Sequence, residues 1–181
     1  LNLPPTDENK REQIALIVSM CIPEFRTGYS EDYLPLLQKA EILSEELEDA
    51  RNRLIIRSYI GYYFIWKDGN SKLGWEYLEG CTEHPELIQD IEFTVPNGYD
   101  LCVFSAILGD YQRVNLIAPK IIGLIENSRS QVEFYGRSFN PYSFILSLWG
   151  IATGFLGHFD KVEKMLEKAI SFAEEINHRA T

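Results

Sequence analysis

The sequence predicts an all-α fold in which about four pairs of helices stack into a right-handed superhelix. The main observation is a set of four glycine turns that lie 41, 40 and 48 residues apart, at Gly28, Gly69, Gly109 and Gly157. The second is that the segments between these turns carry helical patterns. A recurrent unit of roughly 40 residues with two helices is typical of repeat arrays, whose units stack because none buries its apolar face alone.

A residue that can cap a helix follows each glycine turn. Such side chains accept hydrogen bonds from the unpaired amides of the first helical turn, and a carboxylate there also suits the positive end of the helix. The capping residues are Ser30, Asn70 or Ser71, Asp110 and Asp160, with Glu31 and Asp32 after the first turn. An internal echo supports the period, because residues 40–47 and 169–176 share a pattern at an offset of 129, three periods of 43.

The expected helices follow from these signals in chain order. Two segments interrupt the regularity. Residues 84–98 contain Pro85 and Pro96 and can hold an extra turn at 86–91, whereas 127–141 form a long connection. The aromatic residues of that connection, Phe134, Tyr135 and Phe139, suggest a loop that packs against the helices. The helices are expected at 8–24, 31–48, 51–67, 71–83, 97–108, 110–126, 141–156 and 159–177.

Length and composition predict one repeat domain over residues 1–181. The chain has 181 residues of which 45% are hydrophobic, enough for one continuous core. It begins at Leu1 without a leader-like segment, which indicates a fragment of a longer protein. The longest uncharged stretch, 143–159, contains three glycines and ends in a turn, so we interpret it as a buried helix rather than a membrane span.

The charge balance excludes some functions. Lysine and arginine number 17 against 27 aspartate and glutamate residues, which gives a net charge of −10. Nucleic-acid binding is disfavoured, because phosphate backbones need clustered cations and the densest group here is only Arg51, Arg53 and Arg57. Three cysteines, Cys21, Cys81 and Cys102, lie in apolar runs. Buried thiols in a reducing cytoplasm explain them better than disulfides do.

The motifs that could carry chemistry are incomplete. The glycines at 150, 154 and 157 are not followed by the Lys-Ser/Thr pair of a phosphate loop, and close helix packing explains them. Cys81 and His84 have half of a metal-binding spacing without a second pair of ligands. Neither His158 nor His178 has a nucleophile or an orienting acid evident beside it. We therefore expect no catalytic residue, no metal, no cofactor and no enzymatic activity.

The chain resembles a tetratricopeptide array. The last unit shows the pattern most fully, through Leu146, Trp149, Gly150, Gly157, Phe159, Val162, Leu166 and Ala169. The third unit also follows it, the second departs from it because Tyr62 stands at a position for a small residue, and the first is the weakest. Residues 37–49 and 148–160 are similar to the long-repeat C-terminal arrays of bacterial multidomain signalling ATPases.

The resemblance implies an inner, concave face lined by the first helix of each pair. Large aromatic side chains with few rotors suit protein recognition, although the same side chains can instead bury against neighbouring helices. If the aromatic side chains serve recognition, Tyr59, Tyr63 and Tyr99 stay exposed. Leu146, Leu166 and Ala169 are then buried between helices. Trp149 is expected to be buried between the last two pairs. The groove residues are Ile56, Tyr59, Tyr63, Trp66, Tyr99, Val103, Phe144, Ile151 and Phe155.

These observations predict a non-catalytic, cytoplasmic scaffold that docks a protein segment, or a neighbouring domain of its own chain, on the concave face. The alternative is a regulatory sensor that holds a small apolar ligand in a closed pocket lined by Tyr63, Trp66 and Tyr99, and that biases an attached ATPase or cyclase. The expected partner is a protein, not a nucleic acid or a membrane. Uncapped repeat ends also leave self-association open.

Overall fold

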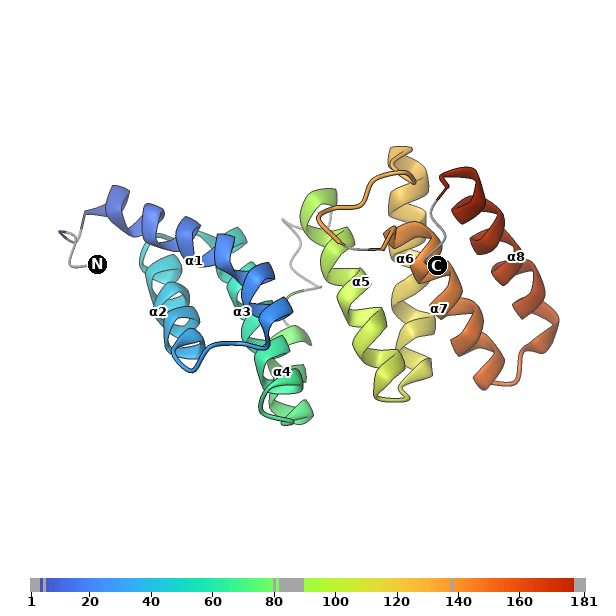
Figure 1. Ribbon diagram of the computed structural model, residues 1–181, viewed down its shortest axis with the longest axis horizontal. Helices are drawn as coiled ribbons and strands as arrows, with labels where there is room; N and C mark the ends of the chain where they lie inside the picture. Colours follow the sequence, from blue (N-terminus) through green and yellow to red (C-terminus); the bar gives the residue numbers. More distant parts are fainter. Residues whose placement is uncertain (1–3, 5, 80, 82–89, 138, 178–181) are drawn as a thin grey trace. The chain divides into compact units, whose positions relative to one another are not determined.

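The computed structural model describes residues 4, 6–79, 81, 90–137 and 139–177. These residues form eight α-helices and no strand, which confirms the all-α prediction (Figure 1). The chain divides into two compact units, Leu1–Leu87 and Ile88–Thr181, each of which is described by itself. The expected single domain and the handedness of the superhelix stay predictions. The helices are α1 (Asp7–Thr27), α2 (Tyr33–Glu46), α3 (Ala50–Trp66), α4 (Ser71–Glu79), α5 (Ile91–Ile107), α6 (Tyr111–Ser128), α7 (Pro141–Phe155) and α8 (Phe159–Glu175).

Consecutive helices pack on one another within each unit. In the first unit α1 contacts α2, α2 contacts α3 and α3 contacts α4; in the second, α5, α6, α7 and α8 follow the same order. The first helices of successive pairs also touch, α1 with α3 and α5 with α7. This nearest-neighbour stacking of helix pairs is the arrangement of a solenoid-like fold.

Each unit has its own apolar core. In the first unit, residues from α1, α2 and α3 come together, and these include Ile14, Ile17, Cys21, Tyr33, Leu37, Ala40, Ile56 and Ile60. In the second unit all four helices contribute, through residues that include Val95, Tyr99, Cys102, Val114, Ile125, Ile145, Leu146 and Ala169. The expected burial of Leu146 and Ala169 is confirmed, whereas Leu166 is only half-buried.

The helix caps follow the glycine turns in part. Gly28 ends α1 at a φ of 91°, a left-handed conformation that glycine adopts without strain. Asn70 and Asp110 cap α4 and α6 as predicted, each accepting a hydrogen bond from a first-turn amide. Ser30 does not cap α2, because its amide and its hydroxyl both donate to the carboxylate of Glu24.

The α5 helix begins six residues before the expected start at 97. Asp90 caps it, with its carboxylate accepting from the amide of Phe93 at 3.2 Å. Pro96 therefore lies inside the helix, where it removes one backbone donor without ending the helix. The side-chain amide of Asn97 donates to the carbonyl of Phe93 at 2.7 Å. Most of the extra turn expected at 86–91 lies outside the described residues.

The connection between α6 and α7 packs against the second unit, as its aromatic residues predict. Tyr135 donates from its hydroxyl to Ser130, and Arg137 forms an ion pair with Asp100 of α5. Phe139 stacks on Phe144 of α7, with 5.1 Å between the ring centroids. The loop is therefore held by its own hydrogen bonds and by the helices that it crosses.

Glycines set the closest approaches between helices. A Cβ at Gly150 would lie 2.8 Å from Leu166, so this glycine lets α7 approach α8, as the sequence predicts. In the first unit the corresponding contact is made by Gly61 instead of Tyr62, because a Cβ at Gly61 would lie 2.8 Å from the carbonyl oxygen of Gly74. The α3–α4 connection, 67–70, is one residue longer than the α5–α6 connection, 108–110. The small contact residue of α3 therefore lies one position earlier in the sequence than the repeat pattern predicts.

Candidate docking surfaces

The predicted groove residues of the first unit differ in exposure. Ile56 is fully buried in the core, so its assignment to a groove is wrong. It faces inward because α3 packs against both α1 and α2. Tyr59 and Tyr63 are half-buried, and Trp66 is 46% exposed at the end of α3.

An aromatic surface forms where α1 and α3 meet. Phe25, which is not among the predicted groove residues, is 42% exposed and makes an edge contact with Trp66, with ring centroids 6.3 Å apart. Phe25 comes just before the Gly28 turn, as Trp66 comes just before the Gly69 turn, and this shared position is the signal that could have identified it. We call Phe25, Tyr59, Tyr63 and Trp66 the first-unit aromatic surface.

Buried neighbours fix the rings of this surface. Tyr29 lies beneath it, with centroid distances of 6.1 Å to Phe25 and 5.3 Å to Tyr63, and it is itself buried. The ammonium of Lys67 donates to the carbonyls of Gly28 and Tyr29, at 3.2 and 3.3 Å. These bonds join the end of α3 to the α1–α2 turn, so they help to fix the backbone segments that carry the exposed rings.

Tyr99 does not line a groove in the second unit. The sequence predicts an exposed ring, but Tyr99 is buried in the core, and burial raises its pKa to about 12. Phe144 of α7 packs beside it, with 5.3 Å between the ring centroids. Val103 and Phe144 are half-buried against the same core, so these positions mainly join α5 to α7.

Ile151 and Phe155 are the exposed groove residues of the second unit. Phe155 stacks on Tyr111, with ring centroids 4.4 Å apart and an interplanar angle of 3°. This contact joins the end of α7 to the start of α6, next to the α5–α6 turn. Further large apolar side chains are exposed at the α5–α6 and α7–α8 turns. We call the whole set the turn-end patch, which consists of Ile107, Leu108, Tyr111, Ile151, Phe155, Leu156 and Phe159.

The remaining predicted groove residues therefore belong to two described surfaces, one in each unit. Tyr59, Tyr63 and Trp66 belong to the first, and Ile151 and Phe155 to the second. Whether any of these residues binds a partner stays a prediction.

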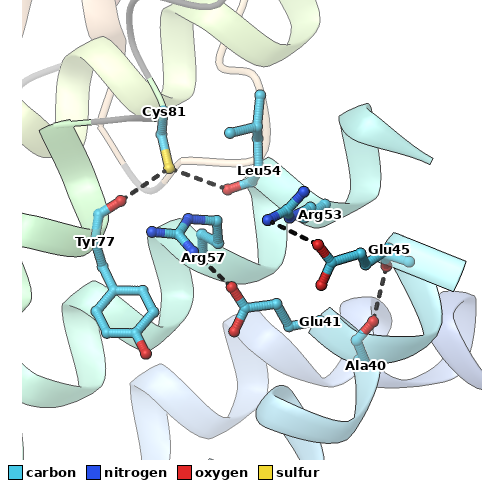
Figure 2. Close-up of polar contacts among 9 residues, drawn as sticks. Ala40, Glu41, Glu45, Arg53, Leu54, Arg57, Tyr77 and Cys81 are labelled. Atoms are coloured by element: carbon cyan, nitrogen blue, oxygen red, sulfur yellow. Dashed lines mark hydrogen bonds and ion pairs between the residues drawn. The ribbon is translucent and has the colours of Figure 1, made fainter. Parts of the chain in front are cut away.

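Two arginines of the densest cationic group are engaged with carboxylates, and one of them also with an aromatic ring, as Figure 2 shows. Arg57 contacts Glu41 at 2.7 Å and lies over the ring of Tyr77, with its guanidinium carbon 4.9 Å from the centroid. Arg53 lies 3.5 Å from Glu45. These arginines thus join α3 to α2 and α4, and their charges are locally balanced.

Groups that could support chemistry are dispersed or inert in the described part of the chain. Cys21, Cys81 and Cys102 are free and buried, as expected, and burial raises the pKa of each thiol to about 12. Among the described residues, no three His, Cys, Asp or Glu side chains are grouped as a metal site would require. His84 and His178 lie outside the described residues. No described helix combines the length and apolar character that a membrane span needs.

Comparison with known proteins assigns no family. No protein-family model matches the chain, and no curated protein matches it either. The structure itself defines the class at a coarser level, as an all-helical array of packed, adjacent helix pairs.

Proposed function

We propose that this chain is a tetratricopeptide-like, non-catalytic interaction module that docks a protein segment on its first-unit aromatic surface. The segment belongs either to another protein or to a neighbouring domain of the same polypeptide. The pairwise stacking of helices, the contacts of α1 with α3 and α5 with α7, and the glycine approaches between paired helices support this assignment. Following the resemblance, we place the module in a bacterial signalling protein.

The contact between Phe25 and Trp66 carries the proposal. Both side chains are more than two-fifths exposed, yet they contact each other edge-on, and Phe25 also packs against the buried Tyr29. A fixed aromatic ring offers a partner a large apolar contact at a small cost in rotamer entropy. Aromatic residues of this kind are enriched among the side chains that dominate binding energy at interfaces.

The charge of the chain suggests what the segment looks like. A protein with a net charge of −10 attracts basic partners and repels acidic ones. We therefore propose a segment with a Leu or Phe anchor that packs on Phe25 and Trp66, flanked by lysine or arginine residues. The same balance, with Arg53 and Arg57 already paired to carboxylates, makes nucleic acid a poor partner.

Isothermal titration calorimetry with synthetic peptides tests the proposal. One peptide carries a Leu and Phe anchor with lysine flanks, and a matched peptide replaces the lysines by glutamates. We expect micromolar binding of the first and much weaker binding of the second. Trp66→Ala should weaken binding by roughly 30-fold, the equivalent of about 2 kcal/mol for a dominant anchor.

Ile42→Ala is the matched control, because Ile42 is an exposed apolar residue of the same unit outside the aromatic surface. Circular dichroism should show the same helicity for both variants. Equal affinity of the wild type and Trp66→Ala, or no binding of either peptide at about 1 mM, would remove the proposed docking site.

A further inference from the structure

We propose that a second copy of this chain docks on the turn-end patch, so that two second units meet in a symmetric homodimer. This goes beyond the docking of a segment on the first unit, and it rests on different residues. It also assigns Ile151 and Phe155, which the sequence places in an inner groove, to a contact between copies.

The patch spans two turns. The stacked rings of Tyr111 and Phe155 connect the start of α6 to the end of α7. Ile107 precedes the α5–α6 turn, and Phe159 follows the α7–α8 turn. Figure 1 shows these two turns at the same end of the second unit. Phe155 and Phe159 are 68% and 74% exposed, which is unusual for two phenylalanines this close in the chain.

The exposed area is large enough for a dimer contact. With about 150 to 250 Å² for a large side chain, the exposed parts of the patch amount to roughly 600 Å². This value is at the upper end of the largest apolar patch on a typical monomer, about 300 to 600 Å². In a symmetric dimer two such patches bury roughly 1,200 Å² in total, which is the lower end of the range for specific interfaces.

The charges around the patch favour a copy of the same chain over a strongly charged partner. Asp110 at the α5–α6 turn is paired with Arg113 at 3.3 Å. At the α7–α8 turn, Asp160 stands next to Lys161. These four side chains beside the two turns sum to zero charge, although the chain carries a net charge of −10. Two copies can approach there without the repulsion that the rest of the surface would produce.

The outer face of α8 is unsuited to end-to-end stacking of copies. Stacking on that face would remove many charges from water without defined partners, which is costly. Apart from Lys168, which is paired with Glu126, the exposed charged side chains among the described residues of α8 are Asp160, Lys161, Glu163, Lys164, Glu167, Glu174 and Glu175. The turn-end patch is thus the more favourable surface of the second unit for self-association.

Sedimentation velocity between about 5 and 500 µM tests the inference, because an interface at the lower end of the size range is expected to associate weakly, with micromolar affinity. The wild type should change from monomer to dimer with concentration. Phe155→Ser combined with Phe159→Ser should shift the midpoint at least 10-fold upward. Phe159→Lys alone should have a similar effect, and this residue is so exposed that the fold should not depend on it.

Ile170→Ser is the control, because Ile170 is an exposed apolar residue on α8 outside the patch. It should leave the dimer unchanged. Three results would each overturn the proposal. The wild type could stay monomeric at about 500 µM, the dimer could persist in Phe159→Lys, or Ile170→Ser could break the dimer. Peptide binding to the first unit should persist in Phe159→Lys, which separates this result from the proposed function.

Discussion

The indole N–H of Trp149 in α7 donates to the side-chain oxygen of Asn115 in α6 at 3.0 Å. The same oxygen accepts from the hydroxyl of Thr153 at 3.1 Å, and the Asn115 amide donates to the carbonyl of Tyr111. Trp149 lies between the last two helix pairs as predicted, but it is half-buried rather than buried, and its polar edge is satisfied between the two helices. One asparagine thus organises the contact of α6 with α7.

Removal of this hydrogen bond should destabilise the second unit. Trp149→Phe keeps an aromatic ring but removes the N–H, and we expect a loss of about 1 kcal/mol in the free energy of unfolding. Trp149→Ala should cost about 3 kcal/mol, because it also removes packing. Urea denaturation followed by circular dichroism measures both. Equal stability of Trp149→Phe and the wild type would show that the bond adds nothing net.

The glycine contact between α3 and α4 should not tolerate a methyl group. A Cβ at Gly61 would lie 2.8 Å from the Gly74 carbonyl oxygen, and backbone cannot move aside as a flexible side chain can. Gly61→Ala should therefore lower stability by about 2 kcal/mol. Gly123 in α6 is the control, since a Cβ there meets nothing within 4 Å.

Gly123→Ala should raise stability by roughly 0.5 to 1 kcal/mol, because alanine loses less backbone entropy in a helix. Thermal unfolding of the two variants should shift in opposite directions. A common direction would contradict the assigned helix contact.

A carboxylate between α6, α7 and α8 should make stability depend on pH. Lys168 donates to Glu126 at 2.7 Å and Tyr142 donates to it at 2.6 Å, and these bonds hold the pKa of Glu126 below its usual range. Because the folded pKa is depressed, the stabilisation is present above the unfolded pKa and is lost as pH falls through the folded value.

Glu126→Gln should therefore reduce the urea midpoint at pH 7, and the difference from the wild type should shrink below about pH 4. The effect should be modest, because Glu126 is partly exposed to solvent. Glu167→Gln, at an exposed position of α8, serves as the control and should show little change at either pH. A difference that grows toward low pH would contradict the assigned ion pair.

Asn140 should control the loop between α6 and α7. Its buried side-chain amide donates to the carbonyls of Gln131 and Glu133, at 2.8 and 3.3 Å, and its oxygen accepts from the amide of Ser143. Asn140→Asp removes the donors and places a carboxylate against two carbonyls, which should cost about 2 kcal/mol. Hydrogen exchange of residues 129–137 should accelerate.

Asn127→Asp is the matched control, because Asn127 is exposed near the end of α6, just before the same loop. It should leave both the stability and the exchange rates close to those of the wild type. Unchanged exchange in Asn140→Asp would show that the loop is held by its other contacts, such as the ion pair of Arg137 with Asp100.

Local signals in the sequence predict local structure well. Gly28, Asn70 and Asp110 end or begin helices as expected, because a turn or a cap depends mainly on neighbouring residues. Ser30 bonds to Glu24 instead, and Asp160 lies in the first turn of α8 without capping it. The same reasoning fails at α5, because Pro96 predicts a break but lies inside the helix. The cap at Asp90 and the bond from Asn97 to Phe93 allow the helix to continue through it.

Exposure is harder to predict, because it depends on residues far apart in the sequence. Tyr99 and Phe144 are 45 positions apart, and nothing near Tyr99 indicates that a second ring will cover it. Ile56 has a helical position suited to an inner face, but α1 and α2 both pack on it. Phe25 and Trp66 could have been paired only through their shared position before a glycine turn.

The buried thiols provide each unit with an intrinsic chemical probe of how often it opens. Cys21 and Cys81 lie in the first unit and Cys102 in the second, and each thiol is both enclosed and strongly protonated. An alkylating reagent needs the thiolate and access to it, so reaction must wait until the surrounding helices separate. The labelling rates of Cys21 and Cys102 therefore measure how often each half of the array opens, within one molecule and without any added probe.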